Sequence, residues 1–261
     1  MANWLALVIG NTRWHWGWFN NSHLKQVWHT EHLSTQPLPA FTLQSLIARQ
    51  APSQLLQIAL ESLEVWAVSV VPPQDQYLQS LSSVHWVTQF PIKDIYPTMG
   101  LDRVATLLGA GHHYNWPVLV IDAGTALTFT AGVDSRFLGG AISLGLRSHL
   151  IALHDYTAAL PQVGLPKDLP TRWASSTSGA IQSGVIHTAL ANVHHFIQSW
   201  QHQYPETNIL FTGGDGQYLY ELYREAYPTK ETQTLTNRIW VDSNLMFWGI
   251  SAYRSEATRV L

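Results

Sequence analysis

The chain has 261 residues, no cysteine, 12% charged side chains and a net charge of −3. The near-neutral balance lacks the basic surface that nucleic-acid binding requires, and the absence of cysteine excludes disulfides and thiolate metal sites. The apolar run at 4–9 is too short for a signal peptide or a membrane span and follows no basic region, so we expect a soluble, cytoplasmic protein that binds neither nucleic acid nor membranes.

The first part of the chain alternates short apolar runs with turn residues, which predicts strands and then helices. Trp14, Trp16 and Trp18 recur at every second position, so they share one face of a strand. Packing under a helix or in a subunit interface is a commoner role for such a face than stacking on a ligand. We expect strands at 4–9, 13–19, 24–30, 65–71 and 84–90, and helices at 41–50, after 72–73 and at 101–114.

The pattern then repeats. We expect a strand, a Gly-Thr turn and a second strand within 117–133, followed by a strand at 135–143, helices at 144–160, 177–203 and 216–226, strands at 208–214 and 239–241, and a helix after 242–243. Each half runs strand, strand, strand, helix before it alternates. This order predicts an internal duplication, with halves at 1–115 and 116–261.

The first turn of each half can be superposed on the other. LVIGNT (7–12) aligns with VIDAGT (120–125), so that Gly10 matches Gly124 and Thr12 matches Thr125, with one extra residue in the first turn. On this alignment Asp122 falls at Val8. One half therefore has an acid where the other has an apolar residue.

These turns have the composition of phosphate-binding loops. Glycine lets backbone N–H groups approach an anion, and Asn and Thr side chains add donors. Gly-Asn-Thr is also ordinary turn chemistry, but two copies at matching places are more informative. Facing each other across a cleft, they could hold a nucleotide triphosphate.

A third motif, YPTMGLDR (96–103), lies between the two turns. Gly100 precedes Asp102 and Arg103 at a predicted helix start, where the helix dipole favours a carboxylate. The two side chains could be a first-turn acid and a surface cation. They could also be a base that accepts a hydroxyl proton and a guanidinium that binds a substrate carboxylate.

Other site types are poorly supported. The adjacent pairs His112-His113 and His194-His195 diverge by about 100° on a helix and cannot chelate as units. The sequence contains no His-Glu-x-x-His, no Walker-type Gly-x-x-x-x-Gly-Lys-Ser/Thr and no Gly-x-Ser-x-Gly. Zinc proteases, P-loop kinases and α/β-hydrolases are therefore disfavoured.

The ordered set of motifs resembles the type III pantothenate kinases of the actin/hexokinase/Hsp70-like superfamily. The motifs are GNT (10–12), GLDR (100–103), DAGTALT (122–128), FLGGAISLGL (137–146), TSGAIQSG (177–184) and FTGGD (211–215). The resemblance extends from residue 5 to about residue 250. It implies an α/β fold of duplicated actin/ribonuclease H-like domains, each a mixed sheet flanked by helices, with a cleft between them.

The resemblance also implies a reaction: transfer of the ATP γ-phosphate to the primary hydroxyl of pantothenate, the first step of coenzyme A biosynthesis. Asp102 would be the catalytic base and Arg103 would hold the pantothenate carboxylate. Thr177 would contact pantothenate, although a Thr at a helix start can simply be an N-cap. The implied substrate-binding set is Tyr96, Gly100, Leu101, Arg103 and Thr177.

The implied cofactors are ATP, Mg²⁺ and a monovalent cation, K⁺ or NH₄⁺. Asp122 would serve the monovalent cation, and Mg²⁺ would bridge ATP oxygens. Gly213 and Gly214 would lie near the adenosine, or could form a plain strand-to-helix turn. The implied nucleotide-binding set is Gly10, Asn11, Thr12, Thr125, Gly213 and Gly214.

Val8 departs from the family pattern, in which an acid at this position orients Mg²⁺. An alternative is therefore a weakened or inactive relative that binds a nucleotide and regulates. Another is a kinase or phosphatase of the same superfamily that acts on a sugar or polyphosphate. The retained GLDR motif favours the pantothenate kinase, and the family pattern and the 12 Trp residues favour a homodimer.

Overall fold

The computed structural model describes residues 3–33, 51, 55, 63–79, 81–228 and 238–259. The helix expected at 41–50 lies outside these residues. The chain forms two compact units: unit 1 comprises Met1–Ile92, Tyr96–Gly109 and Met246–Leu261, and unit 2 comprises Lys93–Ile95 and Ala110–Leu245. The end of the chain thus packs with its beginning, whereas the halves 1–115 and 116–261 stay a prediction of the duplication's boundary.

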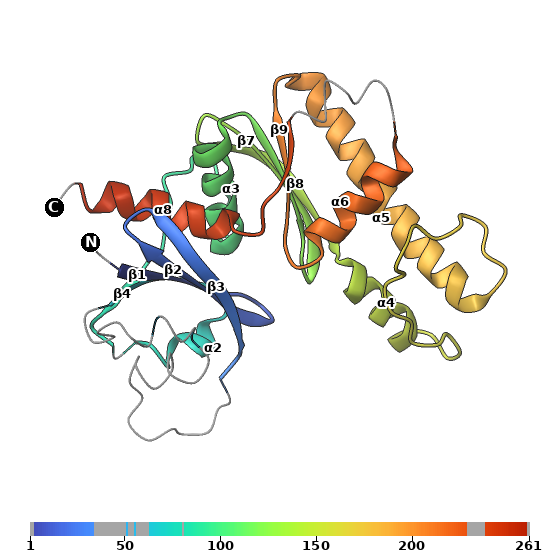
Figure 1. The fold of residues 1–261 in the computed structure, drawn as a ribbon, viewed down its shortest axis with the longest axis horizontal. Coiled ribbons are helices and arrows are strands. Elements are labelled where there is room, and N and C mark those ends of the chain that lie inside the picture. The colour runs from blue at the N-terminus through green and yellow to red at the C-terminus, as the bar shows by residue number, and fades with distance from the viewer. Residues whose placement is uncertain are drawn as a thin grey trace. The chain divides into compact units, whose positions relative to one another are not determined.

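Unit 1 contains a mixed five-stranded sheet (Figure 1). Its strands, in the order β3-β2-β1-β4-β5, are β3 (His23–Glu31), β2 (Arg13–Asn20), β1 (Asn3–Ile9), β4 (Glu64–Ser69) and β5 (Val84–Trp86). The first three strands are antiparallel, and β4 and β5 run parallel to β1. The helices are α2 (Pro72–Asp75), most of α3 (Leu101–Tyr114) and nearly all of α8 (Leu245–Ala257). The strand expected at 84–90 ends early, at Trp86.

Unit 2 contains a second mixed sheet, in the order β10-β9-β6-β7-β8. The strands are β6 (Val118–Ala123), β7 (Ala126–Val133), β8 (Arg136–Leu144), β9 (Asn208–Thr212) and β10 (Ile239–Val241), and the helices are α4 (Leu146–Asp155), α5 (Thr177–Gln203) and α6 (Gly216–Ala226). The helix expected at 144–160 is shorter at both ends. Both sheets have the same strand order and directions, which confirms the expected duplicated α/β fold.

The backbone confirms the superposition of the two turns. Gly10 N–H donates to the Arg13 carbonyl at 3.1 Å, and Gly124 N–H donates to the Ala126 carbonyl at 3.0 Å. Val8 is therefore the structural counterpart of Asp122, and it is buried in β1.

The tryptophans of β2 belong to the core of unit 1. Trp14 and Trp16 are buried with Leu7 of β1. The indole N–H of Trp14 donates to Gln74 of α2 at 3.1 Å, and that of Trp16 donates to Thr30 at 3.2 Å. Each polar atom of these large rings is thus satisfied inside the core. Trp14 and Trp16 therefore pack in the core of unit 1, and Trp14 contacts helix α2 through Gln74.

The core of unit 2 lies between its sheet and the long helices α5 and α6 (Figure 1). Leu119, Ile121 and Ala123 of β6 point into this core. Because successive side chains of a strand alternate between faces, Asp122 lies on the opposite face. The fold therefore places this acid at the end of a buried strand but outside the apolar core.

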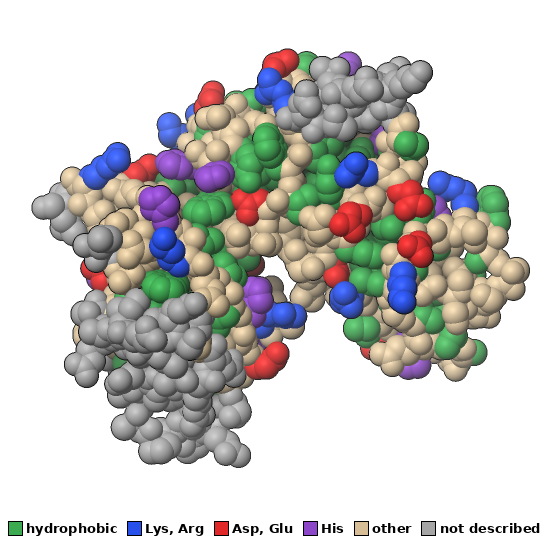
Figure 2. Space-filling view, in the orientation of Figure 1, with side chains coloured by type: hydrophobic (Ala, Val, Ile, Leu, Met, Phe, Trp, Pro, Cys, Tyr) green, Lys and Arg blue, Asp and Glu red, His purple; other side chains and the backbone are tan. Residues whose placement is uncertain are grey.

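The described surface carries few charges. On the face shown in Figure 2, Lys and Arg side chains are interspersed with Asp and Glu rather than gathered in one patch. None of the helices in the described part of the chain has the length and apolarity needed to span a bilayer.

Candidate functional site

The Gly10–Thr12 turn joins β1 to β2 in unit 1. Asn11 and Thr12 are exposed, as expected of residues that bind a ligand. His32 Nε2–H donates to the Gly10 carbonyl at 2.8 Å, which helps to fix the turn. A methyl group on Gly10 would lie 3.3 Å from His15 Nε2, so this imidazole lies beside the glycine.

Asp102 lies in the first turn of α3, with Gly100 directly before the helix. Arg103 N–H donates to Asp102 Oδ1 at 2.8 Å, and Val104 N–H donates to the Gly100 carbonyl at 3.2 Å. A methyl group on Gly100 would lie only 2.5 Å from Asp102 Oδ1. The glycine therefore makes room for the carboxylate, whose pKa is raised by burial despite the Arg103 hydrogen bond and charge. A raised pKa suits a general base.

Arg103, which directly follows Asp102, forms a hydrogen-bonded pair with Tyr96. Arg103 Nη1 donates to the Tyr96 hydroxyl at 3.0 Å, and Tyr96 is exposed. Leu101 is half-buried as the first residue of α3. The structure thus brings Tyr96, Arg103 and Asp102 to one helix start, although their roles stay predictions.

The Gly124-Thr125 turn of unit 2 is held by the start of α4. The Thr125 carbonyl accepts hydrogen bonds from Gly145 N–H at 3.0 Å and from the Ser148 hydroxyl at 2.7 Å. A methyl group on Gly145 would lie 2.1 Å from the Gly124 carbonyl oxygen. Only glycine permits this close approach, so the helix fixes the turn before any ligand binds.

Asp122 lies close to two glycines. Methyl groups on Gly124 and Gly213 would lie 3.3 Å and 2.3 Å from Asp122 Oδ1. Gly213 has φ +86°, whereas a methyl group on Gly214 would contact no atom within 4 Å. Asp215 N–H donates to the Ala123 carbonyl at 2.9 Å and ties this turn to β6. The strand-to-helix turn explains Gly213 without a ligand but does not explain Gly214.

One ion pair of this region was not foreseen from the sequence. Arg147 Nε donates to both carboxylate oxygens of Asp215, at 3.0 and 3.1 Å, and Nη2 contacts Oδ1 at 3.0 Å. The pair joins α4 to the start of α6. Asp215 ends the FTGGD motif, but the motif does not indicate a partner 68 residues away.

Thr177 is the first residue of α5 and is exposed. The N-cap is Ser176, whose hydroxyl accepts the Gly179 N–H at 3.2 Å. The capping role considered for Thr177 is therefore wrong, because the helix begins one residue earlier than that role requires. Thr177 belongs to unit 2, whereas Asp102 belongs to unit 1.

The second turn has a carboxylate that could contact a cation, whereas the first turn has none at the equivalent position. Mg²⁺ in kinases takes one or two carboxylates together with substrate phosphates and water. Asp122 offers such a carboxylate, but its counterpart in unit 1 is Val8. Among the described residues there is no group of three or more His, Asp or Glu arranged to hold a metal.

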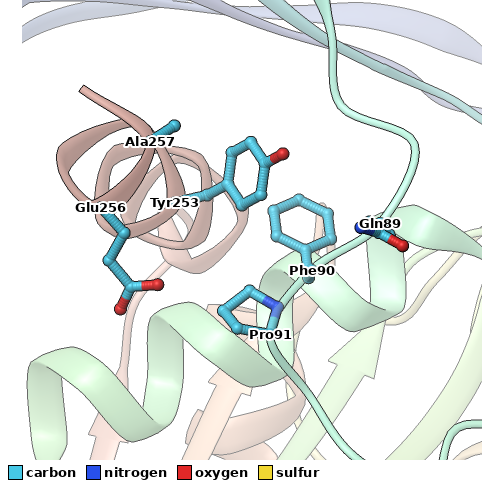
Figure 3. Close-up of a pocket in the computed structure, with 6 residues that line it drawn as sticks. All are labelled: Gln89, Phe90, Pro91, Tyr253, Glu256 and Ala257. Atoms are coloured by element: carbon cyan, nitrogen blue, oxygen red, sulfur yellow. The ribbon is translucent and has the colours of Figure 1, made fainter. Parts of the chain in front are cut away.

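Figure 3 shows a pocket of about 290 Å³ elsewhere in unit 1. The rings of Phe90 and Tyr253 meet edge to face, 5.4 Å between centroids. The full lining is Gln89, Phe90, Pro91, Tyr253, Glu256 and Ala257. No predicted site residue lines this pocket.

Comparison with known proteins gives the family. The sequence model of the type III pantothenate kinase family matches residues 4–199. The chain belongs to this family. The type III pantothenate kinase of Thermosynechococcus vestitus is 37% identical over 98% of this chain and 92% of its own length, and that of Gloeobacter violaceus is 36% identical over 95% and 96%. The family resemblance drawn from the sequence is therefore confirmed, and the regulator alternative is not favoured.

Two solved structures share this fold at lower sequence identity than these family members. A Baf family transcriptional activator from Campylobacter jejuni has a TM-score of 0.63 at 19% identity, over 98% of this chain and 99% of that chain. An activator of 2-hydroxyisocaproyl-CoA dehydratase from Clostridium difficile, with bound ADPNP, has a TM-score of 0.53 at 11% identity, over 99% and 96%. These likenesses confirm the fold expected from the family.

Proposed function

We propose that this chain transfers the γ-phosphate of ATP to the primary hydroxyl of pantothenate, giving 4′-phosphopantothenate for coenzyme A biosynthesis. Membership of the kinase family supports ATP and pantothenate as substrates. The observation that carries the chemistry is the Asp102 carboxylate, which is kept available by Gly100 and has a raised pKa. Asp102 accepts the hydroxyl proton as the oxygen attacks the phosphorus.

The remaining residues bind and orient the two substrates. Gly10, Asn11, Thr12 and Thr125 hold phosphates, and Gly213 and Gly214 lie against the adenosine. Tyr96, Gly100, Leu101, Arg103 and Thr177 hold pantothenate. Mg²⁺ bound to ATP supplies charge neutralisation, which is the main requirement of phosphoryl transfer.

We assign the monovalent cation, K⁺ or NH₄⁺, to Asp122. Its carboxylate lies beside Gly124 and Gly213, two glycines whose missing side chains leave room next to it. Asp122→Asn should remove most of the activation by K⁺. Comparison of rates in K⁺, NH₄⁺ and Na⁺ tests this, and equal activation of both proteins by K⁺ would contradict it.

Arg103→Gln should raise the KM for pantothenate by about tenfold to a hundredfold, because a charge-assisted hydrogen bond to a carboxylate contributes about 1.5–3 kcal/mol. An analogue in which a neutral amide replaces this carboxylate provides the control. Its KM should change little between the two proteins. A similar increase for both compounds would show that Arg103 only supports the fold.

We propose a cytoplasmic homodimer formed through β8. This strand is an edge of its sheet. Ile142 and Leu144 are exposed on one face (62% and 53%), and Leu138, at a β-bulge, is also exposed (44%). Exposed apolar side chains on a strand edge are typical of protein interfaces. The Ile142→Asp, Leu144→Asp double variant should be monomeric by light scattering. A wild-type monomer with full activity would contradict the proposal.

A substrate panel tests the function against the alternatives within the superfamily. Pantothenate should be phosphorylated with a kcat/KM at least about a hundredfold above those for hexoses and polyphosphate. Preference for a sugar would assign the chain to a different reaction. ATP binding without transfer to any acceptor would instead support a regulator.

A further inference from the structure

Three side chains form a row across the strands next to the first turn. Val8 of β1 pairs with His15 of β2, and His15 pairs with His29 of β3. Directly paired residues of antiparallel strands have their side chains on the same face, so both imidazoles share the face of Val8. Their Nδ1 atoms are 3.0 Å apart, and the rings meet edge to face. The two histidines therefore form a hydrogen-bonded pair.

The corresponding row of unit 2 has a different polarity. It consists of Asp122, Thr128 and Ile142, paired in the same way across β6, β7 and β8. The second sheet thus carries a carboxylate on the strand that begins the turn and no imidazole in the row. The first sheet carries an apolar residue there and two imidazoles beside it.

The imidazole of His15 is close enough to the first turn to take part in binding. Its Nε2 lies 3.3 Å from where a methyl group on Gly10 would be. In a pair of neutral imidazoles joined through Nδ1, one Nδ1 donates and the other accepts. When His29 donates, the proton of His15 is on Nε2. Burial, and then the nearby His29 and Arg13, lower the pKa of His15 to about 4, so at neutral pH it is an uncharged N–H donor.

We propose that His15 Nε2–H donates a hydrogen bond to a phosphate oxygen of ATP at the Gly10–Thr12 turn, and that His29 is a positioning residue that fixes the tautomer of His15. Val8 permits this arrangement, because a carboxylate on the same strand position could itself accept the imidazole N–H. The inference rests on the proposed function in one respect: that function places nucleotide phosphates at this turn.

Two substitutions separate hydrogen bonding from packing. His15→Phe keeps a ring but removes the donor, whereas His15→Gln keeps an N–H donor near the position of Nε2. Titration calorimetry with MgATP should show affinity reduced about tenfold to a hundredfold in His15→Phe and within about threefold of wild type in His15→Gln. His23→Phe, at the opposite end of β3, is the matched control and should bind like wild type. The KM for pantothenate should be unchanged in all variants.

A second measurement does not depend on the folding of His15→Phe. The imidazole resonances of His15, identified by their loss in His15→Gln, should shift when ATP is added to the wild-type protein. Wild-type affinity in His15→Phe, equal weakening in both His15 variants, or unshifted resonances at saturating ATP would overturn the inference. Wild-type protein that binds ATP without phosphorylating pantothenate would contradict the proposed function but not the role of His15. Failure of the wild type to bind ATP would overturn both.

Discussion

Asp102→Asn should lower kcat for pantothenate phosphorylation by about 10²- to 10⁴-fold, the range for loss of a general base. Asparagine has nearly the same shape and can still accept the Arg103 N–H, but it cannot take the hydroxyl proton. ATP affinity should therefore stay within about threefold of wild type, since the change removes a proton acceptor rather than a phosphate contact. Asp155→Asn, at the exposed end of α4, is the control and should keep full activity.

The raised pKa of Asp102 sets the sign of two pH effects. The base must be ionised, so kcat/KM should fall as pH decreases through a pKa above the ordinary value of 3.8. Because burial disfavours the ionised form in the folded state, Asp102 lowers stability at neutral pH, and this cost disappears below the unfolded-state pKa. Asp102→Asn should therefore raise Tm at pH 7, with a smaller gain at lower pH. An active or less stable Asp102→Asn variant at pH 7 would contradict this account of the base.

Gly213→Ala should lower the free energy of unfolding by at least about 2 kcal/mol. Its φ of +86° is strained for alanine, and the new methyl group would lie 2.3 Å from Asp122 Oδ1 and 2.7 Å from the Ala123 carbonyl carbon. The backbone contact cannot be relieved by rotating a side chain. Activity should fall with stability, because Asp122 must move. Denaturant unfolding measures the loss.

Gly214→Ala is the matched control, one residue away. The new methyl group would have no atom of the chain within 4 Å, so the free energy of unfolding should stay within about 0.5 kcal/mol of wild type. The KM for ATP should nevertheless rise if the adenosine lies against this glycine. Equal destabilisation by both substitutions would show that the turn geometry described here is wrong, and an unchanged KM would remove Gly214 from the nucleotide site.

Much of the fold could be predicted because it is encoded locally. Strand periodicity and the Gly10 and Gly124 turns predicted the two hairpins and their one-residue offset, and the structure adds an equivalent backbone hydrogen bond in each turn. The proximity of Tyr96, Asp102 and Arg103 could also be predicted, since all three lie within the eight residues 96–103 at and just before the start of α3. Their chemical roles follow from the family resemblance rather than from the local pattern.

Features that depend on long-range contacts could not be predicted in this way. Arg147 meets Asp215 only after α4 and α6 are packed, and Gly145 contacts the Gly124 turn from the next helix. The segment Met246–Leu261 returns to unit 1, where a methyl group on Gly249 would lie 1.9 Å from the Ala105 carbonyl oxygen. No periodicity in the sequence indicates which distant backbone a small residue will face.

Val8 shows what a comparison within one chain can add. The sequence alignment placed it opposite Asp122, and the strand pairing confirmed that position. Only the structure showed that His15 and His29 complete its row. The two sheets therefore differ not only at Val8 and Asp122 but also at the residues paired with them on the neighbouring strands.

The most direct test of the central claim is the product formed by the purified wild-type protein with pantothenate, MgATP and K⁺. Mass spectrometry should show 4′-phosphopantothenate accumulating in a one-to-one ratio with ADP, which would establish that a chain with Val8 in place of the acid is a working kinase. ADP without phosphopantothenate, or ATP bound and unchanged after prolonged incubation, would contradict the proposed reaction.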